Sequence, residues 1–451
     1  MSENRRQHFV AIIGGAIAGS VAAEILADRG TRVAVIEQNK RPYGKIEDGL
    51  PRWHVEQRKQ EYGRIDARLK KPGVDYVPST KLGRDLDFQD LCNWGFSAVI
   101  LANGAWRDRE LGIPGADQFV GKGLVYQNPF IYWYNHWNEK EYTGPQYGAP
   151  DGALVVGGGL ASIDVVKILQ LENYERALKA RGLATSMHEL ERKGIPATCK
   201  VHGVQPEELG VKGCLLIYRR REQDMPLAQP PENATPDQIA KTESVRQKML
   251  RLAREKYLFR VQDRRMPVGL IVEDGRLAGL RVVETRVEGR KAEPIAGSEQ
   301  ELRAPLVVSS IGSVPEVIPG ITMKGEYYTF KDDVLPQYTG CDRVFGVGNV
   351  VTGQGNIRAS LVHSQEVTTQ LVENYIGVGT GSADYVALYA AAEARGAAQA
   401  RAVEERIENL PALSGSEMAA LEQRIRSLQE QVGHTGAYDS WIARETPTDL
   451  E

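Results

Sequence analysis

Two short glycine-rich stretches carry the residues whose types and spacing could do chemistry. They are "VAIIGGAIAGS", from Val10 to Ser20, and "LVVGGGLASID", from Leu154 to Asp164. Each consists of an apolar run, closely spaced glycines and the start of a helical pattern. A turn of this kind presents the free N–H groups of a helix N-terminus to a dinucleotide diphosphate. Two such turns predict two bound dinucleotides, and two dinucleotides held together predict electron transfer between them.

The first turn has the spacing of a dinucleotide-binding fingerprint with one replacement. Gly14 and Gly15 stand at the tight turn, and Gly19 stands where the helix packs on the strand. Ala16 replaces the middle glycine, so its methyl group crowds the phosphate. Glu37 ends the next apolar strand, where a carboxylate can accept hydrogen bonds from ribose hydroxyls. The alternative is a structural glycine turn in an α/β protein.

The second turn is paired with basic residues rather than with an acid. It consists of Gly157, Gly158 and Gly159, with Leu160 next in the chain. The sequence "YRRR" then places Arg219 and Arg220 directly after an apolar strand. Two arginines at this point favour the 2′-phosphate of NADP, which they can bind through charged and often bidentate hydrogen bonds. A solvated basic patch remains the alternative.

The surrounding pattern predicts the elements that position these turns. Alternation around Asp274-Gly275 predicts a β-hairpin over 268–287. We expect 96–106 to be a strand ending at a glycine turn, 304–315 a strand returning to the first domain, and 342–367 a strand, turn and helix. From about 377 the chain becomes polar and helical. An apolar seam within 416–433 predicts a helix that packs on a preceding helix at about 383–409 as a hairpin, on the body of the protein, on a second subunit or on a partner.

Composition narrows the class of protein. The 451 residues carry a net charge of -3, which argues against binding nucleic acid. The four cysteines lie far apart without CxxC spacing, so no redox dithiol, zinc site or other metal site is predicted, and a reducing cytoplasmic compartment fits best. The apolar segment after "ENRR" contains Glu24 and a glycine pair, so we expect strand, turn and helix there rather than membrane insertion.

Further segments resemble adrenodoxin reductase and its family, the FAD-dependent ferredoxin–NADP reductases, and more distantly the glutamate synthase small subunit. The resemblance covers most of residues 8–376. The segments that carry it are "PYGKIEDGLPRWH" (42–54), "VYQNPFIYWYNHWNE" (125–139), "GGGLASIDVVKIL" (157–169), "YRRREQDMP" (218–226), "VVSSIGSVP" (307–315) and "GNVVTGQGNI" (348–357). This chain departs from the family at Ala16, at Leu160, which replaces an asparagine, at Lys167, which replaces an arginine, and at Gly348-Asn349.

The resemblance implies an α/β fold with two Rossmann-like nucleotide-binding domains, in which an NADP-binding domain is inserted into an FAD-binding domain. The expected boundaries are 1–115 and 316–376 for the FAD domain, 116–315 for the NADP domain and 377–451 for a helical C-terminal extension. The implied FAD-binding residues are Gly14, Gly15, Ala16, Gly19, Glu37, Gly44, Gly104, Asn349, Gly355, Asn356 and Ile357. The implied NADP-binding residues are Gly157, Gly158, Gly159, Leu160, Arg219 and Arg220. His54 matches a family histidine near the nicotinamide and is the one catalytic candidate.

The expected activity is transfer of electrons from NADPH through FAD to a one-electron acceptor such as ferredoxin, or the reverse reaction. Basic residues of 244–260 are expected to dock an acidic acceptor. Oxygen or a small organic acceptor also remains possible, and so does the role of a diaphorase subunit in a larger complex. A different class of function is a flavin-bound scaffold that acts through its C-terminal helices, with 411–451 as an oligomer or partner surface.

Overall fold

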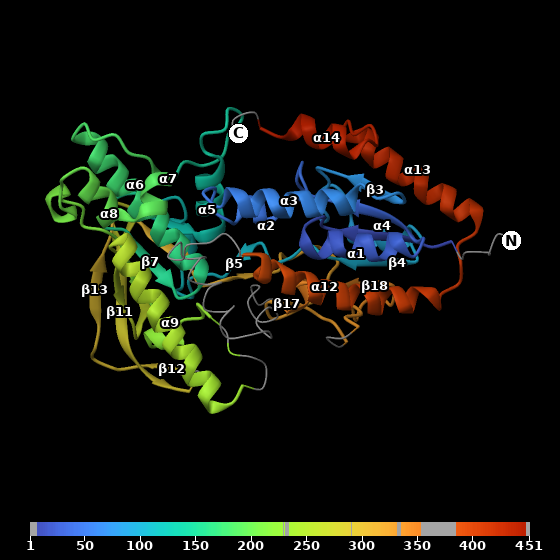
Figure 1. The fold of residues 1–451 in the computed structure, drawn as a ribbon. Coiled ribbons are helices and arrows are strands. Elements are labelled where there is room, and N and C mark those ends of the chain that lie inside the picture. The colour runs from blue at the N-terminus through green and yellow to red at the C-terminus, as the bar shows by residue number, and fades with distance from the viewer. Residues whose placement is uncertain are drawn as a thin grey trace.

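Two parallel β-sheets with helices packed on them form the body of the protein (Figure 1). The structure is a computed structural model, and it describes residues 7–228, 230, 234–289, 291–331, 335–352 and 385–447. The central strands read as unbroken apolar runs because both faces of these sheets are covered by other elements.

The first sheet contains five parallel strands in the order β18-β4-β1-β2-β3. Their bounds are β1 (Phe9–Ile13), β2 (Arg32–Ile36), β3 (Val74–Val77), β4 (Ala98–Leu101) and β18 (Val344–Gly346). The associated helices are α1 (Ile17–Asp28), α2 (Lys45–Asp48), α3 (Val55–Leu69) and α4 (Phe88–Asn93). The strand order reverses at β1, so the crevice beyond the carboxyl end of β1 is the expected place for a nucleotide.

The second sheet repeats this arrangement in the order β6-β14-β7-β8-β9, again with all pairs parallel. Its strands are β6 (Leu124–Tyr126), β7 (Leu154–Gly157), β8 (Leu215–Ile217), β9 (Arg260–Gln262) and β14 (Val307–Ser310). Its helices are α5 (Gln127–His136), α6 (Leu160–Ala180), α7 (Met187–Lys193), α8 (Ile195–Val201) and α9 (Pro236–Tyr257). Three short 3₁₀ turns occur at η1 (Ala116–Phe119), η2 (Pro206–Leu209) and η3 (Glu222–Asp224).

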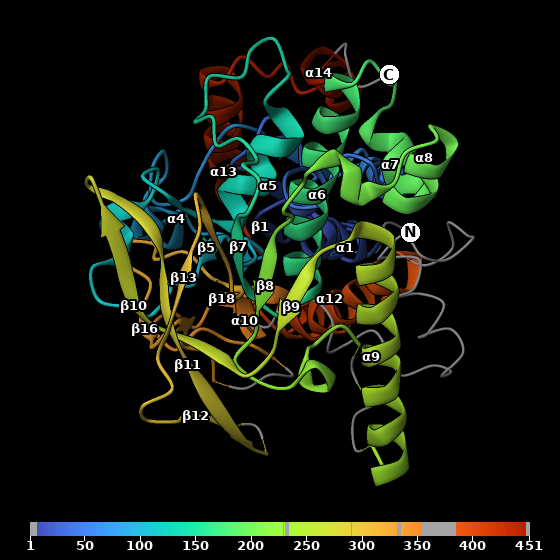
Figure 2. The same ribbon diagram turned by 90° about the vertical axis from the view of Figure 1, so that its left-hand side faces the viewer.

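A separate antiparallel sheet projects from the second one (Figure 2). It contains β10 (Arg265–Glu273), β11 (Arg276–Glu288), β12 (Lys291–Pro294) and β13 (Gln300–Arg303). The turn between β10 and β11 has φ values of 49° at Asp274 and 72° at Gly275. Positive φ at both central residues is what a tight hairpin requires, so the hairpin predicted from this dipeptide is confirmed.

The expectation that 304–315 returns to the first domain is wrong for most of that segment. β14 lies inside the second sheet, between β6 and β7. The crossing occurs immediately afterwards, where β15 (Ser313–Val314) pairs with β5 (Arg107–Asp108). The chain then forms β16 (Met323–Lys324), β17 (Tyr327–Tyr328), β18 and α10 (Asn349–Thr352).

The C-terminal helices do not form the predicted hairpin. They are α12 (Tyr385–Glu408), α13 (Gly415–Gln431) and α14 (Tyr438–Glu445). α12 packs on α1 and buries Ala400, Val403 and Ile407 in the core on one face of the first sheet. The seam of α13 is buried in the core on the other face, so the two helices lie apart (Figure 1).

The apolar seam predicted within 416–433 forms a buried face of α13. Leu421, Ile425 and Leu428 are all buried against the chain's own first sheet. These seam residues are therefore not available to a second subunit or partner, which removes the basis for an interaction surface at 411–451. The C-terminal helices belong to the core of the first unit rather than to a separate extension.

β18 joins the first sheet after the whole second sheet has been completed, so the second sheet lies within a segment inserted between strands of the first. The exact boundaries stay a prediction. Across the described ranges, no helix combines the length and the apolar character needed to span a membrane.

Candidate functional site

The two glycine turns open into one cavity. It has a volume of about 990 Å³ and is lined from both units. The predicted site residues that line it are Gly14, Ala16, Glu37, Gly44, Gly104, Gly157, Gly158, Gly159, Leu160, Arg219, Arg220 and Asn349. Gly355, Asn356 and Ile357 lie outside the described residues.

The glycines of the first turn are required by close packing. Gly14 has a φ of 102°, and a Cβ atom there would lie 2.7 Å from the Ala102 carbonyl oxygen. Gly19 does not line the cavity, and a Cβ atom on it would collide with the Gly14 carbonyl oxygen. These two positions therefore hold α1 close to the end of β1, as the fingerprint requires.

Both glycine turns lead into helices whose N-terminal N–H groups remain available to an anion. α1 begins after Ala16 and α6 begins after Gly159, and neither N-cap residue forms a side-chain capping hydrogen bond. Neither helix has an acidic residue in its first turn. The positive ends of both helix dipoles and their first N–H groups are thus left for a diphosphate.

Glu37 forms hydrogen bonds to the backbone of the first glycine turn and of the loop after β2. Its Oε2 atom accepts a hydrogen bond from the Gly15 N–H at 2.7 Å, and its Oε1 atom accepts one from the Asn39 N–H at 2.9 Å. Burial raises the pKa of this carboxyl group to about 7, although both backbone hydrogen bonds act in the opposite direction. Gly15 therefore does not line the cavity. It holds the Glu37 carboxylate in place by donating its N–H to it.

The two arginines of the second unit lie beside the second turn. A Cβ atom on Gly158 would collide with the ring of Tyr218, so this turn fits closely over the end of β8. Arg219 is exposed, and Arg220 donates from Nε to the Tyr218 hydroxyl at 2.9 Å. Arg221, by contrast, is paired with Asp224 at 2.8 Å. Only the first two arginines therefore face the cavity.

Other elements hold the arginine loop in place. The Thr285 hydroxyl of β11 donates to the Arg219 carbonyl oxygen at 2.7 Å. On α9, Arg246 donates from Nε to the Ala228 carbonyl oxygen at 2.7 Å, and Arg254 pairs with Glu222 at 3.4 Å. Two of the cations that we expected to dock an acidic acceptor are thus engaged within the protein, which weakens that expectation.

His54 does not line the cavity. It is 6% exposed, and its Nε2 atom accepts a hydrogen bond from the Trp53 Nε1–H at 2.8 Å. Burial, with smaller effects from the charges of Lys167 and Arg58, holds the pKa of His54 well below its ordinary value. The imidazole is therefore neutral and packed beside the site, and its arrangement does not support the predicted catalytic role.

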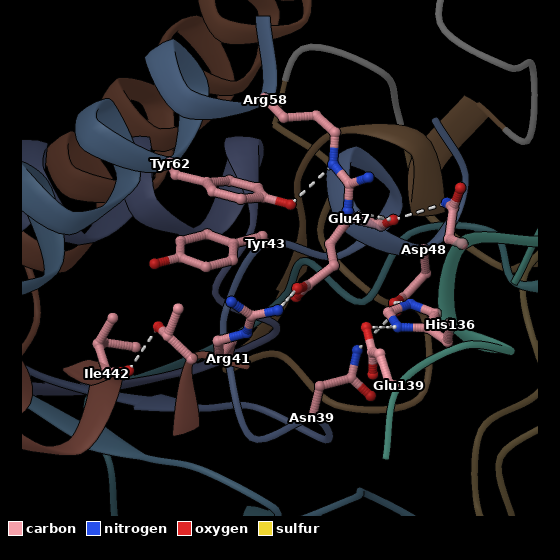
Figure 3. Close-up of polar contacts among 12 residues, drawn as sticks. Asn39, Arg41, Tyr43, Glu47, Asp48, Arg58, Tyr62, His136, Glu139 and Ile442 are labelled. Carbon is pink, nitrogen blue, oxygen red and sulfur yellow. Dashed lines mark hydrogen bonds and ion pairs between the residues drawn. The ribbon is translucent and has the colours of Figure 1, made fainter. Parts of the chain in front are cut away.

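A buried network of charges fixes the loop that forms one wall of the cavity (Figure 3). Arg41 pairs with Glu47, and His136 of α5 bonds Asp48 at 3.1 Å and Glu139 at 2.7 Å. The hydrogen bonds to these two carboxylates raise the pKa of His136 to about 9, against the opposing effect of burial, which is the largest single contribution.

Further contacts tie the same loop to its neighbours. Asn135 donates from Nδ2 to the carbonyl oxygens of Glu47 and Leu50, at 2.9 and 3.0 Å. Tyr43 stacks on Tyr62 with 3.8 Å between the ring centroids. Tyr43 and Asn135 lie inside the recognised segments 42–54 and 125–139, but the sequence does not show that these two segments contact each other.

Sequence reasoning also missed several residues that line the cavity itself. They are Lys45, Asn103, Trp106, Ser313 and Arg395. Lys45 and Trp106 lie inside segments that were recognised, but each is a single residue without a pattern of its own. Arg395 comes from α12, which no nucleotide motif indicates. Within the described residues, no group of His, Cys, Asp or Glu side chains is arranged to hold a metal ion.

Comparison with known proteins agrees with this architecture. Residues 8–175 match the family described as pyridine nucleotide-disulphide oxidoreductase. The matched residues make up less than half of the chain. The match confirms the expected class of enzyme, a pyridine-nucleotide oxidoreductase, and agrees with the expected pair of cofactors, FAD and NADP(H).

Two curated relatives have the names expected from the sequence. The chain is 28% identical to the mitochondrial NADPH:adrenodoxin oxidoreductase of Arabidopsis thaliana over 170 residues, which is 37% of this chain and 34% of that protein. It is 27% identical to the glutamate synthase [NADPH] small chain of Halomonas elongata over 363 residues, covering 76% of this chain and 63% of the relative. The match thus spans about a third of the adrenodoxin oxidoreductase and less than two thirds of the glutamate synthase small chain.

A solved structure matches nearly the whole chain. It is FprA of Mycobacterium tuberculosis in complex with NADPH, with a TM-score of 0.64 and 18% identity over 94% of this chain and 91% of that one. This likeness confirms the expected fold class, with two Rossmann-like domains.

Proposed function

We propose that this protein transfers electrons from NADPH through FAD to a one-electron acceptor such as ferredoxin. The observation that carries the proposal is the single cavity that joins both glycine turns, with Arg219 and Arg220 in the wall near the second turn. One dinucleotide on each turn would bring the two ring ends together inside this cavity.

The residues present fit these two cofactors. The close approach at Gly14 and Gly19 and the uncapped start of α1 suit the diphosphate of FAD, and the start of α6 suits that of NADPH. When bound, the flavin accepts a hydride from the nicotinamide and passes electrons on singly. The protein's part is to hold both rings in contact at about 3–3.5 Å and to exclude water from them.

Two observations bear on the nature of the acceptor. Disulfide reduction is not favoured, because the four cysteines are free thiols and none lies in the cavity wall. A one-electron acceptor fits the names of the relatives, which include the β subunit of a Geobacter sulfurreducens NADPH-Fe(3+) oxidoreductase, 29% identical over 190 residues.

A second candidate is a diaphorase subunit that feeds electrons to a larger complex. The relatives named as small chains and β subunits favour it. The scaffold alternative loses its main support, because the seam of α13 is buried within the chain's own core. The free thiols are consistent with a reducing cytoplasmic location, which we retain as part of the proposal.

The first test is the choice of nicotinamide cofactor. We predict that replacing Arg219 and Arg220 with alanine weakens binding of NADPH far more than of NADH, by about 1.5–3 kcal/mol for each lost charged hydrogen bond. Bleaching of the flavin absorbance at increasing concentrations of each nucleotide measures both affinities.

Arg251→Ala provides the matched control, because Arg251 is an exposed arginine of α9 outside the cavity wall. Equal losses for NADPH and NADH in the double variant would contradict the assignment of the 2′-phosphate site. Absence of bleaching in the unaltered yellow protein would contradict the proposed activity itself.

A further inference from the structure

A lysine that no motif indicates lies in the wall of the cavity between the two glycine turns. Lys45 is the first residue of α2 and directly follows Gly44, which has a φ of 52°. It lines the same cavity as Ala16 of the first turn and Gly159 of the second.

The ammonium group of Lys45 lies where the two units meet. Its Nζ atom donates to the Asn128 Oδ1 at 3.3 Å and to the Ser313 hydroxyl at 3.2 Å. Asn128 belongs to α5 of the second unit, and Ser313 belongs to the β5–β15 crossing. The indole ring of Trp106, from the first unit, has its centroid 5.6 Å from the same nitrogen.

Both hydrogen-bond acceptors of Lys45 are neutral. The acid whose charge acts on Lys45 is Asp108, and its carboxylate accepts a hydrogen bond from the Asn128 N–H at 3.3 Å. Burial lowers the pKa of Lys45 to about 8 and raises that of Asp108 to about 6, and each charge partly opposes the other group's shift. The lysine is therefore a desolvated cation at neutral pH, and it has a third N–H beyond the two that these acceptors use.

We propose that Lys45 faces the ring end of the bound flavin and stabilises the negative charge that reduction places on it. This rests on the proposed function. Two dinucleotides whose diphosphates bind at the two turns must bring their rings together where the two units meet, and the Lys45 ammonium contacts residues of both units. A cation held there in a poorly hydrated wall interacts strongly with nearby charge.

The charge arises in the hydride step. The C–H bond of the reduced nicotinamide breaks, and its hydrogen moves with the electron pair to form an N–H bond on the flavin. NADPH is thereby oxidised to NADP⁺, and the flavin is reduced. The flavin gains one negative charge, because a hydride brings two electrons and only one proton. Charge placed near the ring is one of the means by which a protein adjusts flavin reactivity, so Lys45 makes the bound flavin easier to reduce.

The test is the midpoint potential of the bound flavin, measured in the FAD-loaded protein by equilibration with redox dyes. In Lys45→Met the equilibrium constant for two-electron reduction falls at least tenfold, which corresponds to about 30 mV toward more negative potential. Lys45→Arg keeps most of the original potential because it keeps the charge. Lys122→Met, at an exposed lysine outside the cavity wall, leaves the potential unchanged.

A second variant keeps the test decisive if Lys45→Met does not retain FAD. Asp108→Asn removes the neighbouring negative charge while leaving an amide oxygen to accept from the Asn128 N–H, and it raises the potential. An unchanged potential in Lys45→Met overturns the proposal, and so does an unchanged potential in Asp108→Asn when Lys45→Met lacks flavin. Failure of the unaltered protein to bind FAD is a different result, since it overturns the proposed function.

Discussion

Ala16 of the first glycine turn lies close to Gly44 of the loop before α2. A Cβ atom on Gly44 would lie 2.9 Å from the Ala16 Cβ atom, and both residues line the cavity. We predict that Ala16→Gly binds FAD as tightly as the unaltered protein or more tightly. Ala16→Val lowers FAD affinity at least tenfold, about 1.4 kcal/mol, because its branched side chain occupies space that the diphosphate needs.

Flavin content per protein chain after purification measures this difference. Ala27→Val, which makes the same change on α1 away from the cavity wall, should retain its flavin. A fully yellow Ala16→Val protein would show that FAD does not bind at this turn.

Residues with a fixed spacing could be predicted at this scale, and isolated residues could not. Gly14, Gly19 and Glu37 are recognisable because a turn, a close helix–strand contact and a strand end fix their positions along the chain. Lys45 and His136 carry the charges of the cavity wall and of the network behind it, but each meets its partners only after the two units are assembled.

At the scale of elements, α5 and α2 are joined by the His136–Asp48 contact (Figure 3). The pKa of His136 rises from 6.5 to about 9 in the folded protein. The protonated histidine therefore stabilises the folded state fully below about pH 6.5, and this contribution is lost as the pH rises through 9. This change in the pKa of His136 corresponds to a contribution of about 3 kcal/mol to the free energy of unfolding.

We predict that His136→Gln lowers the free energy of unfolding most at pH 6 and progressively less toward pH 10. Denaturant titrations of both proteins across this range measure the difference, with His188→Gln, at an exposed position on α7, as the control. A destabilisation that is the same at every pH would mean that the histidine acts by packing and not by its charge.

The elements themselves were predictable where local chemistry decides, and not where packing does. Asp274-Gly275 specifies its hairpin through backbone preference alone. β14 could not be assigned to a sheet from its apolar run, because an apolar run of this length fits the centre of either sheet. The seam of α13 predicts a buried face, but it does not say what buries it.

At the scale of the whole molecule, the C-terminal helices pack on both faces of the first sheet. Leu421 and Ile425 of α13 join the core on one face, while Trp441 of α14 joins the core on the other. The Trp441 Nε1–H donates at 2.7 Å to the carbonyl oxygen of Lys40, and the Tyr438 hydroxyl donates at 2.6 Å to Asp66. Asp66 also accepts from Tyr43, which lines the cavity, so these helices support the loop of the proposed flavin site.

Truncation of the C-terminal helices, residues 411–451, should therefore cost the protein its flavin, although the sequence predicts a separate helical extension there. We predict that this deletion exposes the apolar face of the first sheet, lowers stability sharply and yields protein with little FAD. Leu421→Ala should lower the free energy of unfolding by about 2–5 kcal/mol, because it empties a buried site. Arg426→Ala, on the exposed side of the same helix, should change it by no more than about 0.5 kcal/mol. Thermal unfolding and flavin absorbance measure both effects. A truncated protein that stays stable and yellow, and changes only its oligomeric size, would show that α13 and α14 form a surface for assembly rather than part of the core.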